Sequence, residues 1–267
     1  MAKPKSGELV DLSFPVPGVA VATLNLPEVR NAMTAGLTQA WVTAMEAVAA
    51  DRSLRALAVT GAGSAFCSGA DLSWLDQGSI DENTPDRLRE KMLPFYRAWL
   101  APRSLSIPVI AAVNGPAVGA GMCLALACDL RYAAPGATFS APFIELGTHG
   151  GMAASWLLPE AIGLSRAREL LYTGRIVRAD EALEWGLVSG VADDVLARVV
   201  EVAAGIAAAA PIAVRLTKAG LAQAAGSGFE TALQWEALAQ PVTMSTDDIH
   251  EGIRARRERR SPAFEGH

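Results

Sequence analysis

The first sixty residues alternate between apolar runs and turn-forming residues, and this pattern predicts a hairpin, a helix and a strand. Two β-rich runs, residues 9–14 and 19–24, flank a cluster of proline and glycine at residues 15–18, which is typical of a β-hairpin. Thr34 can cap a helix, because apolar side chains follow it at steps of four, four and three residues: Leu37, Trp41, Met45 and Val48. The uncharged run 56–60 then predicts a buried strand.

Two glycine-rich turns, in residues 65–72 and 112–121, each lie between an apolar strand pattern and an apolar helix pattern. The first amides of a helix have no acceptor within the helix, and the helix dipole adds partial positive charge there. Such a turn can bind an anion or a developing oxyanion, and two of them facing one point would polarise a carbonyl. The repeated order of strand, turn and helix, with Asp71 starting one helix and a further strand at residues 130–133, indicates an α/β core of stacked β-β-α units.

From about residue 193 onward the pattern becomes helical. We expect helices in the alanine-rich segment 200–210, in a segment that Pro211 opens, and in residues 229–238. The chain is therefore expected to have an α/β core in residues 1–200 and a helical region in residues 201–267.

Composition excludes several classes of protein. With 51% hydrophobic and 19% charged residues, the 267-residue chain can form one sizeable core, and its net charge of −5 does not favour nucleic acid. Three cysteines without paired spacing predict neither disulfides nor a metal site, and they suggest a reducing compartment. The first residues lack an apolar segment of signal-peptide length, and Pro108 interrupts the uncharged run 104–128. We therefore expect a cytoplasmic location and no membrane partner.

The glycine-rich turns do not match the usual phosphate-binding signatures. The chain has no Gly-Lys-Ser/Thr tripeptide, and residues 61–66 and 115–121 both depart from G-x-G-x-x-G. A nucleotide-binding function is therefore poorly supported.

A series of motifs covers almost the whole chain in the order of one known family. The motifs are Leu24–Met33, Thr60–Leu72, Ile110–Gly121, Cys128–Asp129, Tyr172–Gly174, Ala179–Ala182, Trp185–Val188 and Glu251–Ala255. In these segments the chain resembles the crotonase (enoyl-CoA hydratase/isomerase) superfamily. The resemblance implies a crotonase-like spiral core with a C-terminal helical region for oligomerisation, in a homotrimer or a dimer of trimers.

The resemblance also implies a site for an acyl-CoA thioester, with coenzyme A present as part of the substrate and no separate cofactor. The backbone amides of Ala70 and Ala120 would form the oxyanion hole. The segments that would contact CoA comprise Arg30, Asn31, Ala32, Ser68, Gly69, Ala70, Asp71, Leu72, Gly119 and Ala120. Phe264, in this chain or in a neighbouring subunit, would lie beside the adenine. The basic run 254–260 is either a solvated or interface helix face or a contact for the CoA phosphates.

The positions where this family carries acid and base residues are altered here. Hydratases of the family have two glutamates, and the matching positions hold Cys123 and Phe143; the aspartate that isomerases with such a phenylalanine use corresponds to Gly151. Adding water to an enoyl thioester requires groups that take and deliver protons. We therefore expect little hydratase activity.

Two nearby ionisable residues, Glu145 and His149, are the remaining acid–base candidates. If residues 143–146 are extended, Glu145 shares a side with Phe143; if they are helical, it turns away. Both residues also have structural interpretations, a solvated carboxylate and a loop histidine. The sequence thus predicts an acyl-CoA enzyme that stabilises a thioester enolate, with two alternatives: a non-catalytic acyl-CoA-binding protein, or a CoA-thioester hydrolase using Ser68, Glu145 and His149.

Overall fold

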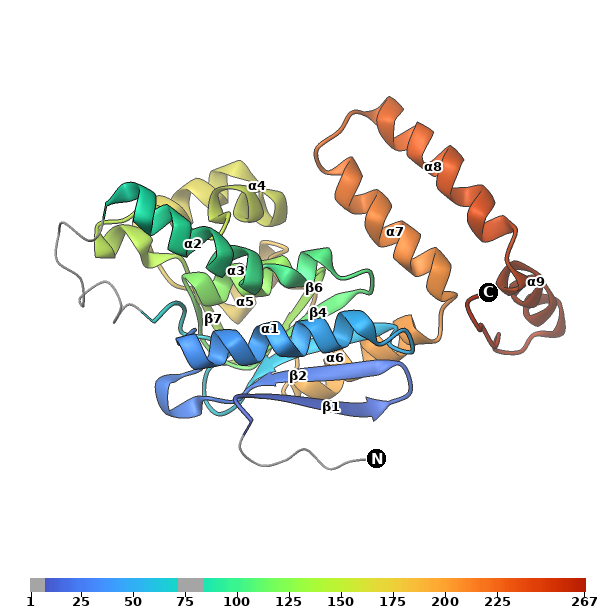
Figure 1. Ribbon diagram of the computed structural model, residues 1–267, viewed down its shortest axis with the longest axis horizontal. Coiled ribbons are helices and arrows are strands. Elements are labelled where there is room, and N and C mark those ends of the chain that lie inside the picture. The colour runs from blue at the N-terminus through green and yellow to red at the C-terminus, as the bar shows by residue number, and fades with distance from the viewer. Residues whose placement is uncertain (1–7, 72–83) are drawn as a thin grey trace.

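Two β-sheets form the centre of the protein in the computed structural model, which describes residues 8–71 and 84–267 (Figure 1). The larger sheet has the strand order β1-β2-β3-β4-β6, and the smaller has the order β5-β7-β8. The strand bounds are β1 Val10–Val16, β2 Val19–Leu24, β3 Ala56–Gly61, β4 Val109–Val113, β5 Ala117–Val118, β6 Leu130–Ala133, β7 Thr138–Ser140 and β8 Val177–Arg178.

The predicted hairpin is confirmed, because β1 and β2 pair antiparallel with Val10 opposite Leu24. The next three pairings of the large sheet are parallel, so each needs a crossover connection. The helices that make or follow these crossovers are α1 Ala35–Ala50, α2 Pro85–Trp99, α3 Ala120–Ala127, α4 Ala154–Thr173, α5 Ala179–Glu184 and α6 Val195–Ala207.

Side-chain alternation along β3 explains why this strand is apolar throughout. Leu57 and Val59 face the cluster that contains the buried side of α1, whereas Ala56 and Ala58 face α6. A parallel strand covered on both faces carries no polar face, as the uncharged run 56–60 predicted.

Helix α1 buries the apolar face that the sequence predicts, and it packs between the sheet and α2. The Thr34 hydroxyl accepts a hydrogen bond from the Leu37 amide at 3.2 Å, which caps the helix. Trp41 stacks on Trp99 with ring centroids 5.2 Å apart, and its indole nitrogen donates to the Ala98 carbonyl at 3.0 Å. This tryptophan pair fixes the C-terminal end of α2 against the core.

The last three helices extend away from the sheets (Figure 1): α7 Pro211–Ala224, α8 Phe229–Met244 and α9 Asp247–Glu258. The predicted boundary near residue 200 falls inside α6, which packs on β2, β3, β4 and β6. We therefore propose that the core continues to Ala207 and that the helical region begins with α7. The predicted helix start at Asp71 and the candidate residue Leu72 lead into residues 72–83, which lie outside the described residues.

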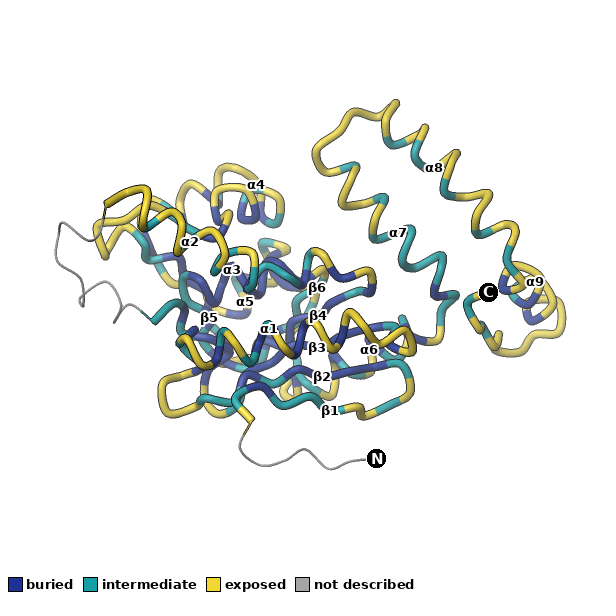
Figure 2. The backbone as a smooth tube through the Cα atoms, viewed as in Figure 1, coloured by how far each residue is buried: buried dark blue, intermediate teal, exposed yellow. Residues whose placement is uncertain are grey.

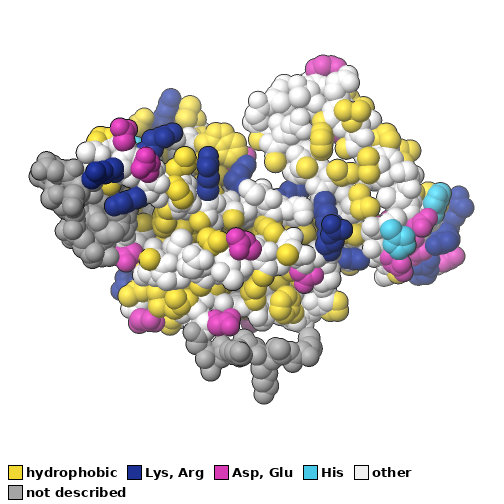
Figure 3. All heavy atoms as spheres, in the orientation of Figure 1, with side chains coloured by type: hydrophobic (Ala, Val, Ile, Leu, Met, Phe, Trp, Pro, Cys, Tyr) yellow, Lys and Arg dark blue, Asp and Glu magenta, His cyan; other side chains and the backbone are white. Residues whose placement is uncertain are grey.

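Helices α7 and α8 pack on each other but leave much apolar surface uncovered. No residue of α8 is buried, and Figure 2 shows this helix coloured as exposed and intermediate along its length. Hydrophobic side chains are visible on the surface of this part of the molecule in Figure 3. The exposed apolar residues of α7 and α8 include Leu221, Phe229, Leu238, Val242 and Met244. Within the described residues no single helix is long and apolar enough to cross a membrane, although α6 and α7 pass that test together as a pair bent by 109°.

One buried ammonium group joins α7 to the core. Lys218 pairs with Asp129 at 2.7 Å and donates to the carbonyls of Pro102 and Ile107 at 3.1 and 2.9 Å. Its side chain is only 11% exposed. The same Asp129 carboxylate accepts a hydrogen bond from the Val109 amide at 2.7 Å, so this interaction ties α7 to the start of β4.

We predict that Lys218→Met loosens α7 while the sheets remain folded. The substitution leaves a carboxylate and two carbonyls without their donor, at a cost of about 1–3 kcal/mol. Amide hydrogen exchange should accelerate across α7, whereas Lys91→Met on the exposed side of α2 should change nothing there. Equal exchange in α7 for both variants would show that Lys218 does not anchor the helix.

Candidate active site

The two glycine-rich turns lie side by side at the C-terminal ends of β3 and β4. The Val118 amide donates to the Cys67 carbonyl at 3.0 Å, and Cys67 forms a parallel bridge with Ala117. Gly69 has φ +100°, and a Cβ built on it would lie 2.7 Å from the Val118 carbonyl oxygen and 3.5 Å from the Ala120 amide nitrogen. The first turn therefore places its backbone directly beside the start of α3.

The Ala70 and Ala120 amides are both available as donors at this junction. Gly119, with φ 54° and ψ −113°, turns the chain into α3, whose eight residues are all buried. Within residues 8–71 and 84–267, no backbone carbonyl accepts a hydrogen bond from either amide. Two neighbouring donors in a shielded position are suited to bind a carbonyl oxygen that gains negative charge.

The segment Arg30–Ala32 lies against the first turn. The Ser68 amide donates to the Arg30 carbonyl at 3.0 Å, and the Met33 amide donates to the Gly69 carbonyl at 2.8 Å. Arg30 and Asn31 have the left-handed φ values 54° and 56°. The predicted CoA-contacting segments are therefore neighbours, although they are 36 residues apart along the chain at Ala32 and Ser68.

The Asn31 side chain stabilises this arrangement and is fully buried. Its Nδ2 donates to the carbonyls of Ala62 and Ala65 at 3.0 and 2.9 Å, and its Oδ1 accepts from the Leu26 amide at 2.9 Å. Because these contacts use the side chain, and the Asn31 amide also donates to the Leu26 carbonyl at 2.9 Å, Asn31 acts here as a structural residue that holds the two segments together.

Cys123, Phe143 and Gly151, the three positions at which the resemblance implies acid–base residues, gather around the first turn of α3. A Cβ on Gly119 would lie 3.7 Å from the Phe143 ring, and the Cys123 amide donates to the Gly119 carbonyl at 3.1 Å. The Cys123 thiol lies 3.7 Å from the Gly151 carbonyl oxygen. Burial raises the pKa of Cys123 to about 12, so the thiol stays protonated at neutral pH. None of the three positions supplies a carboxylate.

Glu145 lies on a turn of 3₁₀ helix, Pro142–Leu146, so residues 143–146 are helical and not extended. The helical backbone turns its exposed side chain away from Phe143: a Cβ built on Gly174, at the end of α4, would lie 2.9 Å from Glu145 Oε1. The ring of His149 is also exposed, with Nδ1 2.7 Å from the Gly150 carbonyl oxygen. The described contacts bring neither side chain to the Ala70 and Ala120 amides.

Ser68 lacks the partner that a serine nucleophile requires. Its hydroxyl donates to the Val29 carbonyl at 3.2 Å, and no described contact joins it to Glu145 or His149. An activated serine needs a base within hydrogen-bond reach. The geometry therefore gives no support to the hydrolase alternative.

Tyr96 on α2 is a polar group at this site that the sequence did not identify. A Cβ on Gly151 would lie 2.6 Å from its hydroxyl oxygen, so the phenol lies against the loop of residues 150–151. Burial raises the pKa of this phenol, so it is neutral at pH 7. In the sequence Tyr96 is one member of an aromatic helix face, which predicts packing and gives no signal of chemistry.

Phe264 lies at the other end of β3 from the amide pair. Arg55, which precedes β3, donates to the Phe264 carbonyl at 2.9 Å, and a Cβ on Gly252 would contact the Phe264 ring at 3.5 Å. The six residues of β3 span about 20 Å. Phe264 is therefore far from the Ala70 and Ala120 amides of its own chain.

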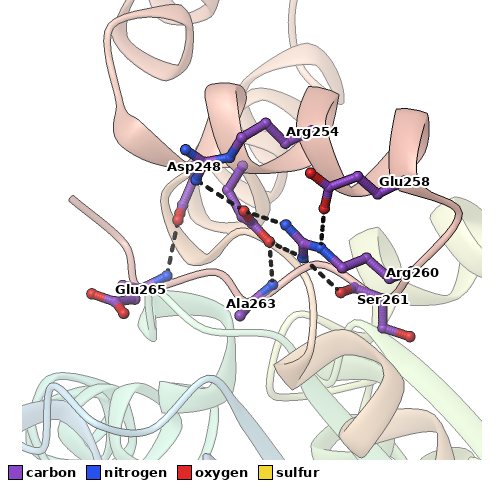
Figure 4. A network of polar contacts seen from close by, with 8 residues as sticks. Asp248, Arg254, Glu258, Arg260, Ser261, Ala263 and Glu265 are labelled. Carbon is purple, nitrogen blue, oxygen red and sulfur yellow. Dashed lines mark hydrogen bonds and ion pairs between the residues drawn. The ribbon is translucent and has the colours of Figure 1, made fainter.

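A network of carboxylates binds the C-terminal tail to α9 (Figure 4). Glu251 accepts hydrogen bonds from Arg260 at 2.5 Å and from the Ala263 amide at 3.0 Å, and Asp248 accepts from the Glu265 amide at 2.9 Å. These contacts lower the pKa of Glu251 well below its ordinary value, the hydrogen bond from Arg260 contributing most. In this structure the basic run 254–260 thus contributes Arg254 and Arg260 to intramolecular ion pairs.

Comparison with known proteins identifies the family of this chain. The family model described as enoyl-CoA hydratase/isomerase matches residues 16–267. The chain belongs to this family. It is 43% identical over 210 residues to the probable enoyl-CoA hydratase EchA14 of Mycobacterium tuberculosis, covering 79% of this chain and 80% of that protein. It is 40% identical over 263 residues to the probable enoyl-CoA hydratase echA12 of Mycobacterium bovis, covering 96% and 92%.

Solved structures of the enoyl-CoA hydratase/isomerase family share the whole fold. An enoyl-CoA hydratase from Bacillus anthracis matches with a TM-score of 0.91 and 33% identity, over 97% of this chain and 100% of that one. The predicted mixed α/β crotonase fold with C-terminal helices is therefore confirmed. Within the described residues, no group of three or more His, Cys, Asp or Glu side chains could hold a metal ion.

We predict that Gly121→Ala disrupts the contact between the two turns. A Cβ at Gly121 would overlap the Cys67 carbonyl, so backbone would have to move, at a typical cost of about 1–3 kcal/mol. Gly136→Ala is the matched control, because a Cβ there meets nothing within 4 Å. Chemical denaturation should show a clear loss of stability for the first variant alone; equal stability would contradict the close packing.

We predict that the tail stays bound at mildly acidic pH. Because the pKa of Glu251 is depressed in the folded state, its contribution is present above the ordinary value of 4.5 and is lost only as pH falls through the lower, folded value. The Ala263 amide should keep its hydrogen-exchange protection at about pH 4.5. Glu251→Gln should reduce that protection, whereas Glu258→Gln should have little effect. Loss of protection in the unaltered protein near pH 4.5 would show that these contacts are absent.

Proposed function

We propose that this protein acts on acyl-CoA thioesters and stabilises the thioester enolate. The thioester oxygen would accept hydrogen bonds from the Ala70 and Ala120 amides. The observation that carries the proposal is the junction of two turns that leaves both amides without a backbone acceptor among the described residues. Removing one donor of such a pair typically costs about 3 kcal/mol of transition-state stabilisation.

The CoA moiety would lie along the backbone of residues 30–32 and 68–72, next to Gly119. Phe264 would contact the adenine from a neighbouring subunit, since within one chain it lies at the far end of β3. Such an arrangement requires an oligomer. The uncovered apolar surface of α7 and α8 supports association with other copies, in a trimer or a dimer of trimers.

Ordinary hydratase activity would be weak, since Cys123, Phe143 and Gly151 surround the amide pair without a carboxylate. The amides polarise a carbonyl, but they neither activate water nor protonate carbon. Acid–base groups typically contribute about 10²–10⁴-fold each. The same three residues favour a second candidate function, an acyl-CoA-binding protein without turnover.

We predict that calorimetry detects binding of acyl-CoA but that water addition to crotonyl-CoA is only a trace activity. Free CoA is the matched control for binding, because it lacks the thioester carbonyl that the amides would bind. Absence of binding by any acyl-CoA would refute the proposed function. Rapid hydration of crotonyl-CoA would refute the interpretation of the replaced carboxylates, and any product formation would exclude the role of a binder without turnover.

A further inference from the structure

The loop of residues 150–151 joins the phenol of Tyr96 to the start of α3 along two paths. Along one, its hydroxyl lies next to Gly151, whose carbonyl oxygen is 3.7 Å from the Cys123 thiol, one turn beyond Ala120. Along the other, Gly150 contacts the Phe143 ring, which contacts Gly119; the built Cβ atoms lie 3.7 Å from the ring in both cases. Residues 150–151 therefore connect the Tyr96 hydroxyl to Cys123 and Phe143, which lie next to the proposed oxyanion hole.

The hydroxyl proton of Tyr96 has a poor acceptor. The hydroxyl donates to the sulfur of Met92 at 3.9 Å. A thioether is a weak acceptor, so this donor is available to a better one. Tyr96 is only partly buried, which leaves its proton able to exchange with solvent.

The backbone next to the phenol is held in a strained conformation. Met152 and Ala153 have φ values of 48° and 56°, in the left-handed region that residues with side chains seldom occupy. Met152 is buried and directly follows Gly151, whose Cβ position lies 2.6 Å from the Tyr96 hydroxyl. Strain of this kind persists where the surrounding structure enforces it, and it is concentrated at functional sites.

We propose that Tyr96 is a catalytic acid–base residue that exchanges a proton with the carbon next to the thioester carbonyl. This inference rests on the proposed acyl-CoA function. In one direction the neutral phenol first loses its proton to solvent water, and the phenolate so formed takes a proton from that carbon; the C–H electron pair becomes the enolate double bond, and the carbonyl pair moves onto the oxygen bound by the two amides. In the other direction the enolate carbon takes a proton from the phenol. No other bond forms or breaks, and no co-reactant is needed.

The test is deuterium exchange into butyryl-CoA, a saturated thioester that cannot be hydrated. The protein is incubated with butyryl-CoA in D₂O, and loss of the C2 proton signal is followed by NMR. We expect exchange by the unaltered protein and a decrease of about 100-fold or more in Tyr96→Phe. Tyr172→Phe is the matched control, because Tyr172 is 71% exposed on α4, and it should exchange at the original rate.

Calorimetry with butyryl-CoA distinguishes a failure of the proposed acyl-CoA function from a failure of the role of Tyr96. If the unaltered protein does not bind, the proposed function fails and the role of Tyr96 fails with it. Binding without exchange, or exchange that survives in Tyr96→Phe, overturns the role of Tyr96 alone. If Tyr96→Phe does not fold, Gly151→Ala tests the role of Tyr96 instead. The added Cβ would lie 2.6 Å from the Tyr96 hydroxyl and displace it. Deuterium exchange should then fall while binding of butyryl-CoA persists, and unchanged exchange would overturn the role of Tyr96.

Discussion

The close approach of two backbone turns is the constraint on which the rest of the structure depends. Gly121 meets the Cys67 carbonyl, and Gly69 meets the Val118 carbonyl, at distances that leave no room for a Cβ. Parallel pairing of β3 with β4 brings the two turns to the same edge of the sheet. The covered faces of that sheet, with α1 on one side and α6 on the other, supply the burial that stabilises this approach.

Because the donors at this junction are the backbone amides of residues 70 and 120, they do not depend on which side chains these residues carry. Alanine at positions 70 and 120 supplies the same amide as any other residue, so binding of a carbonyl oxygen can persist while the surrounding side chains change. Around this site lie a protonated thiol, an aromatic ring and a glycine, at the positions where the resemblance implies carboxylates. Tyr96, whose hydroxyl lies against Gly151, is the group that we propose exchanges a proton here, and it comes from a helix outside the glycine-rich motifs.

Much of the fold could be predicted from the sequence, because its signals are local. The turn between β1 and β2, the cap and apolar face of α1, and the uncharged strand β3 are each encoded in a few consecutive residues. The boundary expected near residue 200 lies inside α6, and we propose a later one, because an alanine-rich helix gives the same pattern whether it packs on a sheet or on other helices. Glu145 could not be placed, since its direction depends on a short 3₁₀ turn that periodicity does not reveal. Tyr96 was missed because its role arises from a loop more than fifty residues away along the chain.

The central claim is that the Ala70 and Ala120 amides together bind a thioester oxygen. A crystal structure of the protein with butyryl-CoA tests this directly. The account predicts the thioester oxygen at about 2.7–3.1 Å from both amide nitrogens, with the acyl chain beside Phe143 and Tyr96. A thioester bound with its oxygen away from either amide, while the two turns keep the geometry described above, would contradict it.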